Sequence, residues 1–249
     1  MRGRDLTSLG GGDLRFPSTL WSRVVSARDD EEEARRRAME DLILRYWKPA
    51  YAYVRFEWGR DNEAAKDLTQ SFFAAFLEKE FLKQVAPEKG RFRSFLKTAL
   101  ANFLRKARRD ERRLKRGGGA LRIPWEEVGD VRDPGPDPAR TAEEAFDRVW
   151  RSEIVARGIR ELQELLEAGG RRVQWEVFEA LVLDETEPSP TREQVAARLG
   201  LRLPQLDHHL HAARDQLRRL LKGILVEGLA DPRDLDDEWS AVLGTETGR

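Results

Sequence analysis

A set of hydrogen-bonding side chains recurs at helical spacing between residues 202 and 218. Amide, imidazole and guanidinium groups on one helix face can bond to base edges and phosphates in the DNA major groove. We therefore expect this face to contact DNA. The set consists of Arg202, Gln205, His208, His209, His211, Arg214 and Arg218. The three histidines are the only ones in the chain. No acidic or sulfur ligand set converges on them, so we expect neither a metal site nor another cofactor.

A second set of residues indicates how that face is positioned. Val195 and Leu199 give a first short helix an apolar stripe, and Gly200 follows where a tight turn needs a positive φ. Pro204 favours the first turn of a new helix. The apolar side of that second helix is formed by Leu206, Leu210, Ala213, Leu217 and Leu220. The pattern predicts a helix-turn-helix, and an ordinary helical hairpin is the alternative.

A strongly basic segment lies earlier in the chain. Residues 91–116 contain eleven lysines and arginines but only two acids, a net charge of +9, although the whole chain has a net charge of 0. Cations can hold phosphates, and aromatic faces can stack on unpaired bases, so we predict contact with DNA. The candidate residues are Lys89, Arg91, Phe92, Arg93, Asn102, Arg105, Arg108, Arg109 and Arg112. The alternative is a solvated basic face over core residues such as Phe95, Leu100 and Phe103.

The periodicity of apolar residues predicts an all-α protein. We expect helices over residues 16–27, 34–56, 62–82, 92–114, 142–168 and 173–183, with Pro49 kinking or breaking the second. Two small helical domains, 16–116 and 141–227, are expected on either side of a Gly/Pro-rich flexible linker at 117–140, and the helix-turn-helix belongs to the second. An acidic tail follows at 228–249, where Leu235, Trp239 and Leu243 predict a short amphipathic helix that packs on the protein itself.

The composition narrows the classes of function. The chain has 249 residues, no cysteine and 36% charged residues. It lacks disulfides, thiolate zinc sites and cysteine nucleophiles, and no Gly-rich phosphate loop is present, so we do not expect an enzyme. No apolar run is long enough to span a membrane, and residues 1–16 lack the apolar core of a signal peptide. A cytoplasmic protein with no membrane partner is expected.

Two motif sets occur in order across the linker. The first combines DLTQSFF at residues 67–73 with RFRSFL at 91–96, a downstream Asn102 and a basic helix end. The second combines EQVAARLG at 193–200 with His211, Arg214 and Arg218 further on. With these motifs the chain resembles the extracytoplasmic-function (ECF) type of RNA polymerase sigma factor. The phrases FPSTLWSRV, GRFRSFLKTALANFL and VEGLADPRDLDDEWSAVL resemble a planctomycete-like branch. The resemblance covers residues 16–116 and 141–243.

The resemblance implies a transcription initiation factor with core RNA polymerase and promoter DNA as partners. It assigns melting of the promoter −10 element to the basic helix and recognition of the −35 element to the helix after Pro204. It also assigns polymerase binding to Asp67 and Gln70, with Asp61 and Glu63 nearby. Lys66 departs from the family pattern, because relatives often carry an acid there.

Lys66 suggests a form of regulation. Phosphorylation of Thr69 by a Ser/Thr kinase would restore negative charge beside Asp67, whereas an anti-sigma factor is the usual kind of regulator. An unmodified Thr69 that bonds to its own helical turn is the alternative. Two other functions stay open: a sigma-like DNA-binding regulator that no longer activates polymerase, and an adaptor or decoy protein. A weakly basic recognition helix favours the adaptor or decoy.

Overall fold

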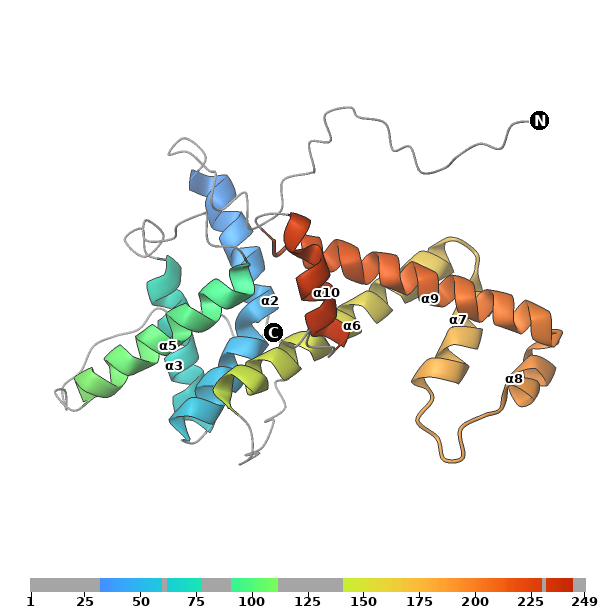
Figure 1. Ribbon diagram of the computed structural model, residues 1–249, viewed down its shortest axis with the longest axis horizontal. Helices are drawn as coiled ribbons and strands as arrows, with labels where there is room; N and C mark the ends of the chain where they lie inside the picture. The colour runs from blue at the N-terminus through green and yellow to red at the C-terminus, as the bar shows by residue number, and fades with distance from the viewer. Residues whose placement is uncertain (1–31, 60–61, 78–90, 112–140, 230–231, 244–249) are drawn as a thin grey trace.

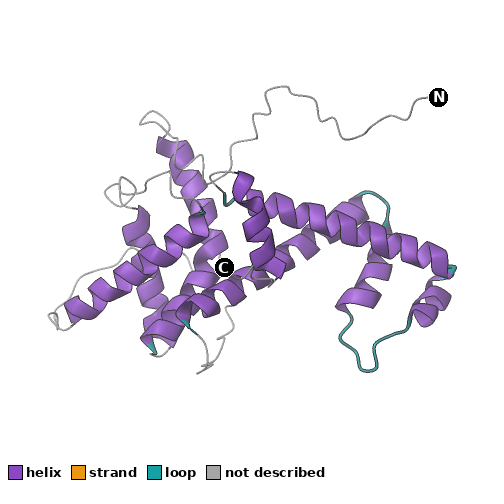
Figure 2. Ribbon diagram, in the orientation of Figure 1, coloured by secondary structure: helices purple, strands orange, loops and turns teal. Residues whose placement is uncertain are grey.

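The computed structural model describes residues 32–59, 62–77, 91–111, 141–229 and 232–243 (Figure 1). Every regular element in these ranges is helical, and none of them contains a strand (Figure 2). This confirms the all-α class. The elements are α2 (Glu32–Trp58), α3 (Asn62–Leu77), α5 (Phe92–Glu111), α6 (Ala142–Ala168), α7 (Arg172–Phe178), η3 (Glu179–Leu183), α8 (Arg192–Leu199), α9 (Leu203–Val226), η4 (Pro232–Asp234) and α10 (Leu235–Leu243).

The first hydrophobic core lies among α2, α3, α5 and the beginning of α6. Its centre is aromatic: Trp47 stacks on Phe73 with ring centroids 5.1 Å apart, and Phe76 meets Phe92 edge-on at 6.1 Å. The helix α2 continues through Pro49 without a break, contrary to one of the two outcomes expected for this residue. Buried residues on both sides of Pro49 pack into the same core, so continuation of the helix is favoured there.

The second core lies among α6, α7, α8 and α9, and Trp175, Phe178 and Leu206 are buried in it. Thr191 begins α8 with a reciprocal capping box, in which its hydroxyl accepts from the backbone N–H of Gln194. Gly200 ends α8 with a φ of 65°, as the sequence predicts for this position.

The helix α6 belongs to both cores. Its first half contributes Phe146 and Trp150 to the first core, and its second half contributes Leu162 and Leu166 to the second. Leu225, near the end of α9, returns to the first core. The expected domain boundary at residue 141 therefore does not separate the two cores, because apolar faces of single helices serve both of them. The segments at 16–27 and 117–140, expected as a helix and a linker, lie outside the described residues.

The C-terminal helix α10 lies against the first core and α9 (Figure 1). Leu235 and Trp239 pack against the first core, and the ammonium of Lys222 lies 5.4 Å from the ring centre of Trp239. This confirms the prediction that the amphipathic helix of the tail packs on the protein. Leu243 is an exception, because 58% of it is exposed at the end of the helix.

Candidate nucleic-acid interface

The basic helix α5 has two ends with different surroundings. At its N-terminal end, Phe92 is fully buried in the first core and Arg93 is only 8% exposed. These two residues cannot contact DNA in this structure, which corrects their assignment as DNA-binding residues. Phe92 is buried because it packs edge-on against Tyr46 and Phe76.

Arg93 is held by two carboxylates from distant parts of the chain. Its Nε lies 3.1 Å from Oε2 of Glu238 in α10, and its Nη1 lies 2.7 Å from Oδ1 of Asp147 in α6. The guanidinium also lies over the ring of Trp150, 4.4 Å from the centroid. Burial alone would lower the pKa of Arg93, but Glu238 and Asp147 outweigh burial and raise that pKa above its ordinary value.

Two neighbouring cations also pair with acids of α10 and α6. Nη2 of Arg91 lies 2.6 Å from Oδ2 of Asp237, and Nζ of Lys97 lies 3.0 Å from Oδ2 of Asp147. Only 27% of the Arg91 side chain is exposed. The expected positive patch is thus neutralised at this end of α5 by α10 and α6, so Arg91 is a poor candidate for DNA contact in this arrangement.

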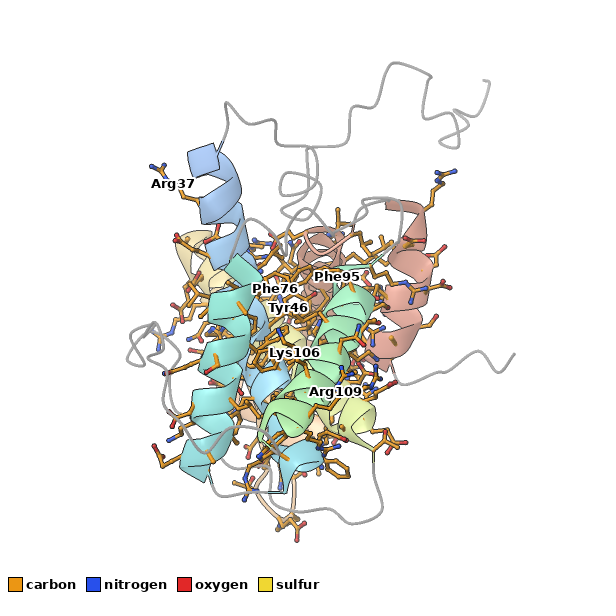
Figure 3. The ribbon with its side chains drawn as sticks, turned by 90° about the vertical axis from the view of Figure 1, so that its left-hand side faces the viewer. Arg37, Tyr46, Phe76, Phe95, Lys106 and Arg109 are labelled. Atoms are coloured by element: carbon orange, nitrogen blue, oxygen red, sulfur yellow. The ribbon has the colours of Figure 1, made fainter. Side chains whose placement is uncertain are left out.

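The C-terminal end of α5 keeps its exposed positive charge. Four cations are exposed there: Arg105, Lys106, Arg108 and Arg109. Lys106 and Arg109 project from this end of the helix (Figure 3). Asn102 is also exposed and accepts a 2.9 Å hydrogen bond from Arg105. Lys89 and Arg112 lie outside the described residues.

A pocket of about 350 Å³ lies between α2 and this end of α5. Arg105, Arg108 and Arg109 line it together with Tyr53 and Glu57. Arg108 pairs with Glu57 at 2.8 Å. Burial raises the pKa of Tyr53, and Glu57 adds to the effect, so the phenol stays neutral. Sequence reasoning missed Tyr53 and Lys106. Tyr53 and Glu57 are four residues apart, a spacing that places them on one face of α2. The spacing does not show that this face meets α5.

The second basic surface is the exposed face of α9, which follows α8 and Gly200. Arg202 precedes the helix, and its backbone N–H donates to Oε1 of Gln205 at 3.0 Å. Both residues are exposed, as are His208 and Arg214, and Arg214 has no ion-pair partner among the described residues. His209 is half-buried. The sequence prediction of one polar face opposite the buried Leu206, Leu210 and Ala213 is confirmed.

An acid lies between two of the expected DNA-binding residues of α9. Asp215 accepts from Nη1 of Arg218 at 2.7 Å and lies 3.1 Å from Nε2 of His211. At the start of the helix, Asp207 pairs with Arg192 of α8 at 3.1 Å. These acids reduce the positive potential of the face. The sequence could have predicted the two Asp215 pairs, because His211 and Arg218 lie four and three residues from Asp215, within reach on one helix.

The α3 surface carries the residues expected to bind polymerase. Glu63 and Asp67 are exposed and Gln70 is half-buried, while Asp61 lies outside the described residues. Lys66 pairs with Glu63 at 2.9 Å, so it neutralises part of this acidic surface.

Thr69 bonds to its own helical turn, as the alternative to phosphorylation predicts. It is fully buried, and its hydroxyl donates to the carbonyl of Ala65 at 2.8 Å. A kinase cannot reach this hydroxyl in the folded chain, which corrects the proposed phosphorylation site.

The described residues contain no group of three or more His, Asp or Glu side chains that could hold a metal ion. Among the described helices, none combines the length and apolar character needed to cross a membrane. The chain matches no protein-family model, no curated protein and no solved structure.

Proposed function

We propose that this chain is a bacterial sigma factor of the extracytoplasmic-function type, which directs core RNA polymerase to promoters in the cytoplasm. The observation that carries the proposal is the exposed cation cluster at the C-terminal end of α5, at Arg105, Lys106, Arg108 and Arg109. Three of these cations, Arg105, Arg108 and Arg109, line a pocket together with the buried Tyr53. Exposed cations around one pocket are suited to hold the phosphates of a separated strand.

The pair of helices α8 and α9 supports duplex recognition. The Gly200 turn joins a short helix to a longer one with an exposed polar face, as in a helix-turn-helix. We propose that α9 enters the major groove at the −35 element. Gln205, His208 and Arg214 are well placed to reach base edges and phosphates, because they are exposed and, unlike His211 and Arg218, do not face Asp215.

Polymerase binding is assigned to α3. Glu63 and Asp67 are exposed acids on one stretch of that helix, and they would pair with basic side chains of the polymerase. Gln70 is next to them and can add hydrogen bonds.

Open-complex formation tests the role assigned to α5. The full chain and bacterial core polymerase are incubated with a pool of promoter-bearing DNA, and permanganate detects unpaired thymines. Arg105→Ala with Arg109→Ala should abolish the reactivity, while polymerase binding is retained. The matched control, Arg171→Ala with Arg172→Ala, removes the same charge from exposed positions at the start of α7 and should leave the reactivity unchanged. Equal reactivity of the two double variants would contradict the assignment.

A second function is favoured by the Lys66–Glu63 pair, which neutralises one acid of the proposed polymerase surface at 2.9 Å. The chain would then be a sigma-like regulator that binds DNA without activating polymerase. Co-purification with core polymerase separates the two functions, because only the sigma factor should be retained on it.

A further inference from the structure

A second pocket, distinct from the proposed DNA surfaces, lies where α2, α6 and the end of α9 meet. Its volume is about 210 Å³. Arg45 of α2 and Arg157 and Arg160 of α6 line it, so three guanidinium groups face one small space. Arginines that converge in this way are suited to bind a carboxylate or a phosphate.

The acids near these arginines do not match them in number. Arg45 and Arg157 share a single carboxylate, that of Glu227, which accepts from Nη1 of Arg157 at 2.9 Å. Arg157 also donates to Glu161 at 2.7 Å. Glu153, the acid that lines the pocket, pairs with Lys48 at 3.0 Å. Arg160 has no ion-pair partner among the described residues.

The surroundings of Arg45 disfavour its charge. Burial lowers the pKa of Arg45 and the nearby guanidinium of Arg157 lowers it further, while Asp41 and Glu161 offset part of the shift. An anion in the pocket would relieve both effects. Glu227 and Glu161 pair with two of the three arginines, and Glu153 pairs with Lys48, so the positive charge left unpaired is close to one. One charge suits a monoanion better than a phosphate monoester, which carries nearly two.

Beside Glu153 and Tyr46, apolar residues also form part of the pocket wall. Leu44, Ile154 and Ile224 line it, and Leu44 is 43% exposed at its edge. An engineered apolar cavity of about 150 Å³ holds one benzene molecule, so a volume of about 210 Å³ can hold one ring with a carboxylate attached.

We propose that this pocket binds a small monocarboxylate with an apolar body about the size of one ring. The carboxylate lies between Arg160 and the N–H groups of Arg45 and Arg157 that Glu227 leaves free, and the apolar body packs on Leu44, Ile154 and Ile224. Because the wall comes from three helices, of which α6 and α9 contribute to both cores, an occupant stabilises their arrangement. The site is independent of the proposed function, since no DNA or polymerase contact is part of it.

Fluorine NMR of the full chain with para-fluorobenzoate tests the proposal. The neutral para-fluorobenzamide reports binding that comes from the ring alone. The wild-type protein should broaden the benzoate signal, with a Kd of about 1 mM. It should leave the benzamide signal sharp. Arg160→Gln should weaken benzoate binding at least about fivefold, since a charge-assisted hydrogen bond is lost. Arg148→Gln is the matched control: it removes one charge from the same helix outside the pocket and should change the Kd less than about twofold.

Three results would overturn the proposal. The first is equal broadening of benzoate and benzamide, which would leave only an apolar cavity. The second is equal weakening by Arg160→Gln and Arg148→Gln, which would mean a general charge effect. The third is no broadening by benzoate at up to about 10 mM. Thermal unfolding of each variant checks folding, and Leu44→Asn, which changes only the exposed apolar edge, should also weaken benzoate binding.

Discussion

Arg93 and Glu238 form a buried ion pair that joins the start of α5 to α10, although the two residues are 145 positions apart in the sequence. Glu238 is 3% exposed and Arg93 is 8% exposed. Two buried charges are costly to desolvate, and they persist here because several hydrogen bonds and Asp147 compensate them. The pair therefore fixes the tail on the basic helix.

Glu238→Gln should lower the free energy of unfolding by about 3 kcal/mol, because it leaves the charge of Arg93 buried with only Asp147 beside it. Urea unfolding followed by circular dichroism measures the change. Asp236→Asn, at an exposed position of the same helix, should change the stability by less than about 0.5 kcal/mol. Similar losses in the two variants would mean that the buried pair has no special role.

The buried phenol of Tyr46 should make the free energy of unfolding fall at alkaline pH. Burial raises the pKa of its phenol, and the charge of Glu238 adds to the effect, so the fold favours the protonated form. The resulting stability is complete below the pKa of an unfolded tyrosine, about 10, and is lost as pH rises above it. Relative to Tyr46→Phe, wild type should lose up to about 1.4 kcal/mol per pH unit in this range. Parallel stability curves for the two proteins between pH 9 and pH 11 would contradict the prediction.

Alanine substitutions of Gly200, which caps α8, and of Gly223, inside α9, should change the free energy of unfolding in opposite directions. Gly200 has a φ of 65°, so Gly200→Ala should cost about 1 kcal/mol although no neighbouring atom obstructs the new methyl group. Gly223 lies inside α9 with open space around it, and Gly223→Ala should add about 0.5 to 1 kcal/mol. Chemical unfolding of both variants tests this pair, and a stabilising Gly200→Ala would show that the turn is not held in the left-handed region.

Asp215 should weaken the proposed DNA contact, because it neutralises Arg218 and faces His211. Asp215→Asn should raise the affinity for duplex DNA several-fold at low salt and less at high salt. Fluorescence anisotropy with labelled DNA at two salt concentrations measures the effect. Glu164→Gln, at an exposed position of α6, is the control and should leave the affinity nearly unchanged. An unchanged affinity for Asp215→Asn would argue against contact through this face.

The features predicted well from the sequence are those set within one helix. The buried stripe of α9 and the left-handed Gly200 depend on spacing and backbone sterics over a few residues. The bounds of α6, Ala142 to Ala168, follow in the same way from the capping residue Thr141 and the two glycines after the helix.

The features that were missed depend on contacts between distant residues. The run of cations from Arg91 onward indicated one continuous DNA-binding helix, but the partners of Arg93 lie in α6 and α10. Thr69 illustrates the same limit, because its position on a polar stretch of sequence did not reveal that its side faces the core. Charge patterns show which residues can bind an anion, whereas the tertiary fold decides whether that anion is DNA or a carboxylate of the chain itself.

Transcription by core RNA polymerase from a library of random promoter sequences tests the proposed function most directly. With the full chain present, sequencing of the transcript ends should reveal starts downstream of a shared pair of DNA elements, and without the chain these starts should be absent. The double variant Arg105→Ala with Arg109→Ala should bind polymerase and give no such starts. Identical transcript ends with and without the chain would contradict the proposal that it is a sigma factor.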